Sequence, residues 1–417
     1  MQTKLHKYKK IMSCRMCNSK KIKRIYNFGL IPIGNDLQKN CRNSLACKKY
    51  PLELMNCIKC NHFQISISVN PKILYAKNYT YLTGVTKTFK DHFKNYSKWI
   101  IQKCKLKKKA LILDIGSNDG TCLSFFKKEN MTVVGIDPAK KPCKIANNKK
   151  ITTLNKFFNK KTSKQLEKKF GKFDFITSHN VLAHTENIQE IFFSIYNLLK
   201  ENAYFCFEIG YFKDVIKHNL FDTIYHEHLD YYHAKPLINF LEKVGFSVID
   251  LSTNKIQGGS LRILLQKKIQ NKKTDKVIKF LNEERKFFKK VNVFRQIKNF
   301  IQTLTKLNHQ IIKEKDRGHS IYAYGSPTKA SLLLYLSNLS NNAIKYSIED
   351  NPLKCNKYIP GTNIKIINSK KIKMSENSVI IILAWNFARE IILRLKKQNY
   401  KNIKLVIPLP KLISKKI

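Results

Sequence analysis

The chain has 417 residues, enough for two or three domains with buried cores, and 43% of them are hydrophobic, which excludes an intrinsically disordered protein. Its 79 Lys and Arg residues outnumber 28 Asp and Glu residues and give a formal net charge of +51. Lysine is spread over the whole chain together with much Asn, Ile and Phe, so the composition favours a bias toward A/T-rich codons over nucleic-acid binding as the source of this charge.

Membrane spans and signal peptides are both excluded by the pattern of apolar residues. The longest late apolar run, Val379–Trp385, is far too short to cross a bilayer. The N-terminal stretch MQTKLHKYKKIMSC is charged and lacks the apolar core of a signal peptide. We therefore expect a cytoplasmic protein without membrane contact, in which paired cysteines bind a metal and do not form disulfides.

Residues 1–70 carry two C-x-x-C pairs, Cys14 with Cys17 and Cys57 with Cys60. Each pair can present two thiolates from one turn, and two such turns complete a tetrahedral zinc site. The sequence therefore predicts a small zinc-binding domain whose closed, all-cysteine site is structural. Two further cysteines, at positions 41 and 47, do not have this spacing and are expected to be free or buried.

Aromatic residues at spacings of three and four predict a helical connector within residues 78–99. Phe89, Phe93 and Tyr96 form this stripe, which is most simply explained by packing. Tyr79 and Tyr81 precede it, in a position from which a loop could reach an active site.

The stretch LILDIGSNDG, residues 111–120, predicts a buried strand that runs into a glycine turn and opens a helix. Gly116 and Gly120 allow a tight turn and a close approach of backbone to a ligand. A second strand, within Met131–Pro138, ends in Asp137. The pattern is a βαβ unit with an acidic residue about 20 positions after the glycines.

The spacing D-x-G-x-x-x-G differs from the G-x-G-x-x-G of dinucleotide sites. Asp114 would repel a pyrophosphate but suits an ammonium group. The pattern resembles motif I of class I S-adenosylmethionine (SAM) methyltransferases. This resemblance implies that Asp114 and the Gly116–Gly120 turn, with Ser117 and Asn118, hold the methionine part of SAM, and that Asp137 accepts two ribose hydroxyls. The alternative is an α/β turn that binds no nucleotide.

Residues 172–266 continue the α/β pattern with two expected strands and one helix before two closing strands. The first strands are 172–178 and 203–208, the helix is 188–199, and the closing strands are 248–251 and 260–266, joined by the turn 257–259. Loops at the carboxyl ends of parallel strands face the ligand crevice, so His184 and Glu208 are well placed. A structural role for a single histidine there remains the competing interpretation.

Residues 221–233, FDTIYHEHLDYYH, concentrate histidine, tyrosine and carboxylate side chains. The zinc-protease pattern H-E-x-x-H fails, because the residue four positions after His226 is Asp230. Within a strand, His226 and His228 would share one face, with Glu227 opposite, and would enclose a metal poorly. A general base with near-neutral pKa, oriented by tyrosine and carboxylate neighbours, fits better. A packed aromatic-polar strand is the alternative.

The last hundred residues restart an α/β pattern after a lysine-rich helical bridge over residues 267–317. The strands 320–324, 343–348 and 379–384 predict a second Rossmann-like unit. It lacks G-x-G-x-x-G, so we expect no complete dinucleotide site. A helix N-terminus next to Lys329 would suit a phosphate.

The whole chain resembles the zinc-containing, SAM-dependent C-methyltransferases that act on nucleotide-linked deoxysugars. The similar motifs, in order, are the paired C-x-x-C turns, DIGSNDG, NVLAH, IYHEHLDYY, QGGSLR, YGSPTKA, NPLKCNKYIPGT and AWNF. The family tends to show YGAPAKG where this chain has YGSPTKA. The resemblance implies an α/β protein with a zinc-binding domain over residues 1–70, a class I SAM methyltransferase domain over 71–267, and a helical connector with a C-terminal Rossmann-like domain over 268–417.

The resemblance also implies the reaction and its residues. The substrate would be a nucleotide-linked 4-keto-6-deoxyhexose, methylated at C-3, and the cofactors SAM and Zn²⁺. By motif match, His228 would be the base, with Tyr79, His184, Tyr225 and Glu227 around the sugar. Loss of a proton next to the ketone gives an enolate that is nucleophilic at carbon, so the site needs a base near that C–H and donors for the enolate oxygen.

Two rival functions use the same sequence differently. A basic, zinc-bearing RNA or DNA methyltransferase would explain the charge directly but not the histidine-tyrosine stretch or the second α/β domain. A binding protein with a degenerate SAM site is disfavoured by the intact acidic and glycine positions. The sequence leaves the nucleotide, the sugar and the oligomeric state open, a monomer included.

Overall fold

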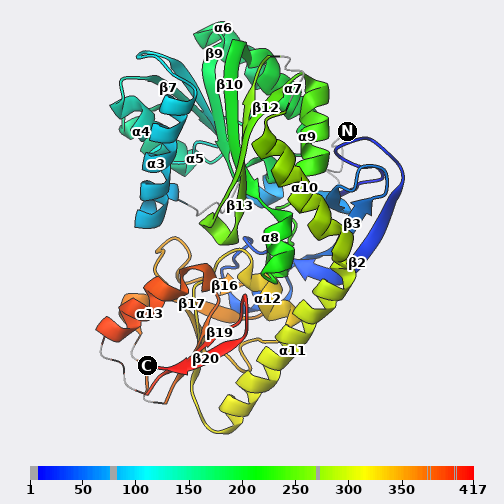
Figure 1. Ribbon diagram of the computed structural model, residues 1–417. Helices are drawn as coiled ribbons and strands as arrows, with labels where there is room; N and C mark the ends of the chain where they lie inside the picture. The colour runs from blue at the N-terminus through cyan, green and yellow to red at the C-terminus, as the bar shows by residue number, and fades with distance from the viewer. Residues whose placement is uncertain are drawn as a thin grey trace, which may run out of the picture.

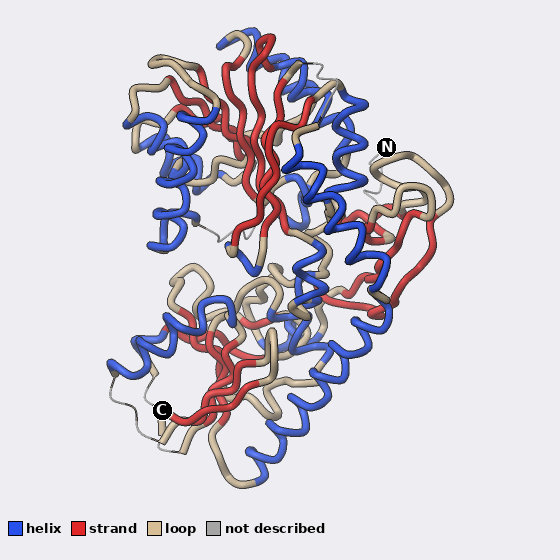
Figure 2. The backbone as a smooth tube through the Cα atoms, in the orientation of Figure 1, coloured by secondary structure: helices blue, strands red, loops and turns tan. Residues whose placement is uncertain are grey.

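The computed structural model describes residues 8–75, 82–268, 273–372, 374–375, 377–398, 400 and 402–417. Two seven-stranded sheets dominate it, one in the upper half of Figure 1 and one in the lower half, and the N-terminal strands lie at their side. Helices cover the faces of both sheets, as Figure 2 shows in blue. Within these ranges no helix combines the length and the apolar composition that a membrane crossing requires.

The N-terminal part forms a four-stranded sheet in the order β11-β4-β3-β2 and a small pair, β1-β5. Its elements are β1 (Tyr8–Lys10), β2 (Ile22–Pro32), α1 (Cys41–Leu45), β3 (Lys49–Cys57), β4 (Phe63–Ile65), β5 (Ile67–Val69) and α2 (Pro71–Tyr75). The edge strand β11 (Asp230–Tyr231) comes from much later in the chain and pairs antiparallel with β4. The histidine-tyrosine stretch therefore closes the sheet of the zinc-binding part.

The central sheet has the order β12-β13-β10-β9-β6-β7-β8. Its strands are β6 (Leu111–Ile115), β7 (Thr132–Asp137), β8 (Thr152–Asn155), β9 (Phe173–His179), β10 (Leu199–Gly210), β12 (Ser247–Asn254) and β13 (Ser260–Gln266). Its helices are α3 (Lys87–Lys103), α4 (Thr121–Lys128), α5 (Lys140–Asn148), α6 (Lys160–Phe170), α7 (Ile188–Leu198), α8 (Phe212–Lys217) and α9 (Ala234–Val244), with 3₁₀ turns η1 (Thr83–Val85), η2 (Leu182–His184), η3 (Phe221–Thr223) and η4 (Ile256–Gly258). Strands β10, β9, β6, β7 and β8 run parallel, and their buried residues are mostly apolar because helices cover both faces of the sheet.

The connector is helical, as the sequence predicts, and consists of α10 (Asp275–Lys290) and α11 (Val293–Asp316). The C-terminal sheet follows in the order β16-β17-β15-β14-β18-β19-β20. Its elements are β14 (Ile321–Tyr324), α12 (Ala330–Leu336), β15 (Tyr346–Glu349), β16 (Tyr358–Ile359), β17 (Ile364–Asn368), η5 (Ser369–Lys371), β18 (Val379–Ile382), η6 (Trp385–Phe387), α13 (Ala388–Lys397), β19 (Lys404–Ile407) and β20 (Ile413–Lys416). Chain order reverses between β14 and β18, as in a doubly wound sheet.

Two local expectations differ from the structure. The aromatic stripe is helical and Phe89, Phe93 and Tyr96 are buried, but the helix begins only at Lys87, where the Thr86 hydroxyl caps it. The stretch 221–233 is not a strand: it is a 3₁₀ turn and a loop that ends in the two-residue strand β11. Its histidines bond to backbone carbonyls instead of pairing in a strand: His228 to Thr223 within the stretch, and His226 to Tyr50 and Pro51 of β3.

Candidate active site and metal centre

The four paired cysteines meet at one point. The Sγ atoms of Cys14 and Cys60 lie 3.5 Å apart, those of Cys17 and Cys57 lie 3.6 Å apart, and all four lie within 4.8 Å of one another. Sulfur atoms around a tetrahedral zinc, each about 2.3 Å from the metal, are separated by about 3.8 Å. The donor set therefore fits zinc, and four thiolates leave no position open for water.

The two cysteine turns are built alike. In the first, the amide of Asn18 donates to the Cys14 carbonyl at 2.8 Å; in the second, Asn61 donates to the Cys57 carbonyl at 2.8 Å. Both asparagines have positive φ, 59° and 65°. Asparagine tolerates this left-handed conformation better than most residues, so C-x-x-C-N is the local signal that folds each turn.

The glycine turn of residues 116–120, which we call the SAM turn, has the backbone geometry that Gly116 and Gly120 predict. Gly116 and Gly120 have φ of 76° and 74°. A Cβ atom on Gly116 would lie 2.1 Å from the side chain of Val181, so no larger residue fits there without movement. The Gly116 amide donates to the Ile136 carbonyl at 2.8 Å, which holds the turn against β7.

Two buried carboxylates flank this turn. Asp137 accepts from the amides of Asn118 at 3.0 Å and Ala139 at 2.8 Å, one on each oxygen, which leaves lone pairs for two ribose hydroxyls. Among the described residues, Asp114 Oδ1 and Ser117 Oγ have no hydrogen-bond partner. Burial, with a smaller effect of Asp137, raises the pKa of Asp114 well above its usual range. A buried acid of this kind fits the ammonium group of SAM.

His184 and His228 form a pair that lines the same cleft as the SAM turn. The rings of His184 and His228 are 4.8 Å apart, and His184 Nδ1 donates to the Glu227 carbonyl at 2.7 Å. His228 Nδ1 donates to the Thr223 carbonyl at 2.9 Å, so its Nε2 carries the lone pair and accepts from the Tyr225 hydroxyl at 3.1 Å. Four of the five predicted sugar-site residues thus come together; Tyr79 lies outside the described residues.

The expectation of a histidine with near-neutral pKa is wrong for this site. Burial, His184 and the cation of Lys329 lower the pKa of His228 to about 3, and burial lowers that of His184 to about 4. Both rings are therefore neutral at physiological pH. Burial raises the pKa of Glu227 to about 8, against the opposing field of Lys354. Below about pH 8 the Glu227 carboxyl therefore carries a proton, which it can donate in a hydrogen bond.

The C-terminal domain supplies the facing wall of the cleft. Lys329 Nζ lies 3.3 Å from the centroid of the Trp385 ring and 3.6 Å from Asp222 Oδ2, and the Trp385 indole donates to the same oxygen at 2.6 Å. The lysine is thus engaged by an acid of the central domain. Helix α12 after it has only seven residues. The predicted phosphate site at this helix end is not supported.

The turn that follows β14 is fixed by the same two kinds of hydrogen bond as the SAM turn. Gly325 has φ of 86°, and its amide donates to the Ile348 carbonyl at 2.7 Å. The Ser326 amide donates to Glu349 Oε2 at 2.9 Å, where Glu349 ends β15 as Asp137 ends β7. Two similar crevices therefore face one cleft of about 1330 Å³, which both domains line.

Glu208 does not face this cleft, contrary to expectation. It is buried and accepts from His92 at 2.7 Å, His179 at 3.2 Å and Arg262 at 2.6 Å. Burial would raise its pKa, but the two histidines hold that pKa well below its usual range. Since Arg262 occupies one carboxylate oxygen, this cluster is an ion-pair network behind the SAM turn and a poor metal site.

Three family models match the chain in the order that the structure shows. They are described as "Putative zinc binding domain" (residues 14–75), "Methyltransferase domain" (90–251) and "C-methyltransferase C-terminal domain" (255–410). The C-methyltransferase NovU of Streptomyces niveus is 25% identical over 406 residues, which cover 96% of each chain. The chain is a SAM-dependent C-methyltransferase with an N-terminal zinc-binding domain.

Solved structures match a smaller part of this C-methyltransferase. Magnesium protoporphyrin IX methyltransferase of Synechocystis PCC 6803 with bound SAM is 16% identical, with a TM-score of 0.33, and the match covers 42% of this chain and 78% of that one. A SAM-dependent methyltransferase of Clostridium acetobutylicum ATCC 824 is 15% identical, with a TM-score of 0.34, over 42% and 92%.

Sequence reasoning missed several residues of the cleft. Asp222, Lys354 and Trp385 line it or hold a lining residue, but the sequence did not single them out within their motifs, which for Lys354 is NPLKCNKYIPGT and for Trp385 is AWNF. Asp222 stands in the same dense stretch as His228, which was the one available signal. Arg15 was missed because it lies in the zinc turn, far along the chain from its partners.

Proposed function

We propose that this C-methyltransferase methylates C-3 of a nucleotide-linked 4-keto-6-deoxyhexose. The observation that supports this function is the partly buried pair of His184 and His228, with Tyr225, on a wall of the cleft that the SAM turn also lines. Carbon methylation requires a carbanion equivalent, and a carbon next to a ketone provides one when it loses a proton. The site combines a neutral base with a phenol donor, as this step requires.

The lone pair on His228 Nε2 makes it the proposed base. Its Nδ1 proton is held by the Thr223 carbonyl at 2.9 Å, so the incoming proton is taken at Nε2 and the ring becomes an imidazolium. Once Nε2 is protonated it no longer accepts from the Tyr225 hydroxyl, which would then donate to the enolate oxygen. Neutral His184 has its one ring proton on Nδ1, donated to the Glu227 carbonyl, so it would orient this segment and not serve as that donor. Glu227 and Tyr79 would bind the sugar. When bound, SAM supplies the methyl group to the carbon.

The nucleotide would lie against the C-terminal domain. The cleft continues past the sugar site to Lys354, Arg394 and the turn at Gly325–Lys329. Lys354 and Arg394 already pair with Glu349 and Asp350, so both cations are held at the crevice. Because the same cleft reaches the SAM turn, one elongated substrate can bring its sugar to the cofactor while its charged end contacts cations.

We also propose the boundaries 1–70, 71–267 and 268–417 for the three domains.

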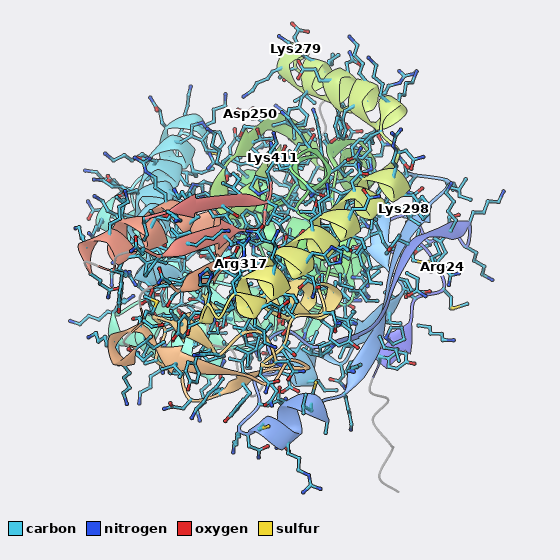
Figure 3. The ribbon with its side chains drawn as sticks, turned by 90° about the horizontal axis from the view of Figure 1, so that it is seen from below. Arg24, Asp250, Lys279, Lys298, Arg317 and Lys411 are labelled. Carbon is cyan, nitrogen blue, oxygen red and sulfur yellow. The ribbon has the colours of Figure 1, made fainter. Side chains whose placement is uncertain are left out.

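The net charge does not by itself favour a nucleic-acid substrate. Lys279, Lys298 and Lys411 are exposed on α10, on α11 and beside β20, and Figure 3 shows them pointing from separate elements. The cleft itself carries acidic and neutral side chains together with the cations.

Incubation with labelled SAM and a panel of nucleotide sugars tests the proposal. We expect transfer to 4-keto-6-deoxyhexose nucleotides, with the new methyl group on C-3 by NMR, and none to matched sugars that lack the ketone. Total RNA and duplex DNA are included as acceptors. Label in nucleic acid and not in any keto sugar would overturn the proposal, and absence of SAM binding would make the chain a binding protein.

A further inference from the structure

Arg15 connects the zinc site to the histidine pair. It lies inside the first cysteine turn, between Cys14 and Cys17, yet its side chain is only 8% exposed. Its Nε donates to both oxygens of Asp230, at 3.0 and 3.1 Å. Its Nη1 donates to the Glu186 carbonyl at 2.8 Å and its Nη2 donates to the Thr185 carbonyl. One guanidinium therefore holds two separate segments of the central domain.

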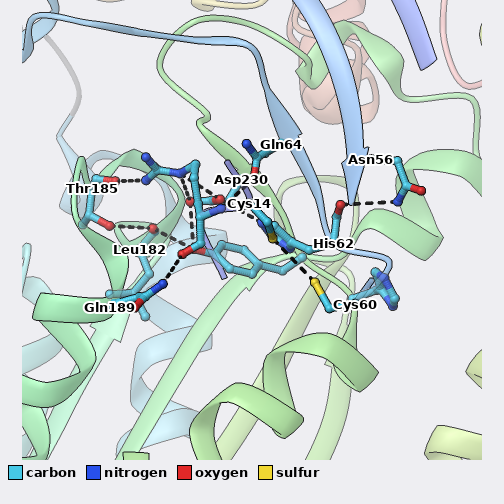
Figure 4. Close-up of polar contacts among 12 residues, drawn as sticks. Cys14, Asn56, Cys60, His62, Gln64, Leu182, Thr185, Gln189 and Asp230 are labelled. Atoms are coloured by element: carbon cyan, nitrogen blue, oxygen red, sulfur yellow. Dashed lines mark hydrogen bonds and ion pairs between the residues drawn. The ribbon is translucent and has the colours of Figure 1, made fainter. Parts of the chain in front are cut away.

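The backbone of Arg15 is fixed as firmly as its side chain. Its amide donates to Gln64 of β4 at 2.8 Å, and its carbonyl accepts from Gln189 at 3.0 Å, at the start of α7. Figure 4 labels the partners of these contacts, Gln64, Thr185, Gln189 and Asp230, in one region of the structure. A change in the shape of the cysteine turn must therefore move the guanidinium, the loop before α7, or both.

Both held segments carry a histidine of the proposed site. Thr185 directly follows His184, and Asp230 stands two residues after His228. The Leu229 amide donates to the Ala183 carbonyl at 2.7 Å and joins the two segments side by side. Arg15 thus contacts both segments within two residues of the histidine that each carries.

Asp230 collects further donors at this junction. His62 Nε2 donates to its Oδ1 at 2.8 Å, and the Tyr232 hydroxyl contacts its Oδ2 at 3.3 Å and the Leu182 carbonyl at 3.0 Å. All of these side chains are buried. A buried carboxylate with several donors is costly to disturb, so the junction has one preferred geometry.

We propose that Arg15 is a positioning residue that couples the folded zinc turn to the placement of His184 and His228. This inference rests on the proposed function for the role of the two histidines, but the coupling itself does not. The planar fork of arginine reaches a carboxylate and two carbonyls at once, which the ammonium of lysine cannot do. Without the fork, the loop of residues 182–189 and the segment 227–231 lose their common anchor.

Amide hydrogen exchange of the substrate-free protein, read by mass spectrometry, tests the coupling. Arg15→Lys should raise exchange in residues 182–189 and 227–231 at least tenfold, with zinc content and SAM affinity unchanged. Arg24→Lys is the matched control, because the Arg24 side chain is 60% exposed and forms its ion pair with Glu53, in the same N-terminal sheet. Unchanged exchange in Arg15→Lys would overturn the inference.

Two further measurements extend the test: hydrogen exchange after chelation of zinc, which needs no substrate, and the rate of methyl transfer. Chelation of zinc from wild type should raise exchange in the same two segments, and should add little in Arg15→Lys, whose anchor is already lost. Equal additional effects in both proteins would contradict coupling through Arg15. In methyl transfer, Arg15→Lys should lower kcat about 10- to 100-fold, the range for outer partners of a site, with KM for SAM unchanged. Equal loss in Arg24→Lys would contradict the role. If no keto sugar is methylated, the exchange result still decides the inference.

Discussion

His184 and His228 are tied to each other through one peptide. His184 Nδ1 donates to the carbonyl of Glu227, the residue before His228, and the two rings lie 4.8 Å apart at an angle of 57°. Neither histidine can shift without the other, so the pair presents a fixed geometry to a substrate.

His228→Asn should lower turnover by about 10²–10⁴ while SAM binding remains near normal, because removal of a general base typically costs that factor and the SAM turn is untouched. His218→Asn, an exposed position on the protein surface, is the control and should retain activity. Exchange of the sugar C-3 proton into deuterated water without SAM, followed by NMR, isolates the step. Wild type should exchange and His228→Asn should not.

The same measurement assigns the partners of the base. Equal exchange in wild type and His228→Asn would move the base elsewhere, with His184 the next candidate. Loss of exchange in both His228→Asn and Tyr225→Phe would show that the phenol, 3.1 Å from Nε2, acts with the imidazole as one unit.

Acid should destabilise the protein through its buried histidines. Burial lowers the pKa of His184 and His226 to about 4 and that of His228 to about 3, below the unfolded value near 6.5. A depressed folded pKa gives stability that is complete above 6.5 and is lost as the pH falls toward the folded pKa. Each histidine therefore costs on the order of 2 kcal/mol between pH 7 and pH 5. Urea unfolding at both values, for wild type and His226→Asn, measures this.

The comparison uses the change with pH and not the absolute stability. His226 donates to backbone carbonyls of Tyr50 and Pro51, so its replacement lowers stability at every pH. The loss between pH 7 and pH 5 should nevertheless be smaller in His226→Asn than in wild type. An identical loss in both would contradict the assignment, as would a smaller loss in the exposed control His218→Asn.

The parts of this site built from residues that are neighbours in sequence were predictable. The parts that depend on contacts between distant segments were not. The SAM turn and the cysteine turns follow from residues that are neighbours in sequence, where glycine and asparagine meet the backbone geometry directly. A strand over residues 221–233, the alternative interpretation of that stretch, is wrong, because its side chains bond to backbone carbonyls such as those of Thr223 and Tyr50. Its histidine pKa values depend on burial, which periodicity does not reveal.

The part of the cleft that the C-terminal domain forms was also only partly predictable from the sequence. The YGSPTKA turn was predicted in the right place, with a helix N-terminus next to Lys329 that would suit a phosphate, but the contacts of Lys329 with Asp222 and Trp385 were not predicted. Those partners come from segments that no spacing rule relates to it. Arg15 is the strongest case, since its cysteine turn was predicted and its contact with Asp230 could not be.

Asp137→Ala should weaken SAM binding by about 1–3 kcal/mol, the range for hydrogen bonds to a charged group. The carboxylate also accepts from the Asn118 and Ala139 amides, so the matched variant Asp137→Asn should lose less, because its amide keeps one acceptor oxygen. Calorimetry with SAM measures both. Unchanged affinity in Asp137→Ala would contradict the assigned ribose contact.

Removal of the cysteine ligands should release the metal and loosen the N-terminal sheet. Wild type should contain one zinc per chain, and the double variant Cys14→Ser, Cys57→Ser should contain none, since each turn then keeps a single thiolate. The chain offers a matched control in Cys41→Ser, Cys47→Ser, because these two cysteines lie between the turns and outside the cluster. Elemental analysis and thermal unfolding measure metal and stability together.

The expected drop in Tm follows from where the zinc turns sit. Cys14 and Cys57 pack into the same buried cluster as residues of the central sheet, so loss of the metal opens a core that both parts share. Structural zinc contributes directly to folding free energy, and a chelator should therefore reproduce the effect of the ligand variant on wild type. Wild-type protein that is stable and active without metal, or a control variant that loses zinc to the same extent, would contradict the four-cysteine site.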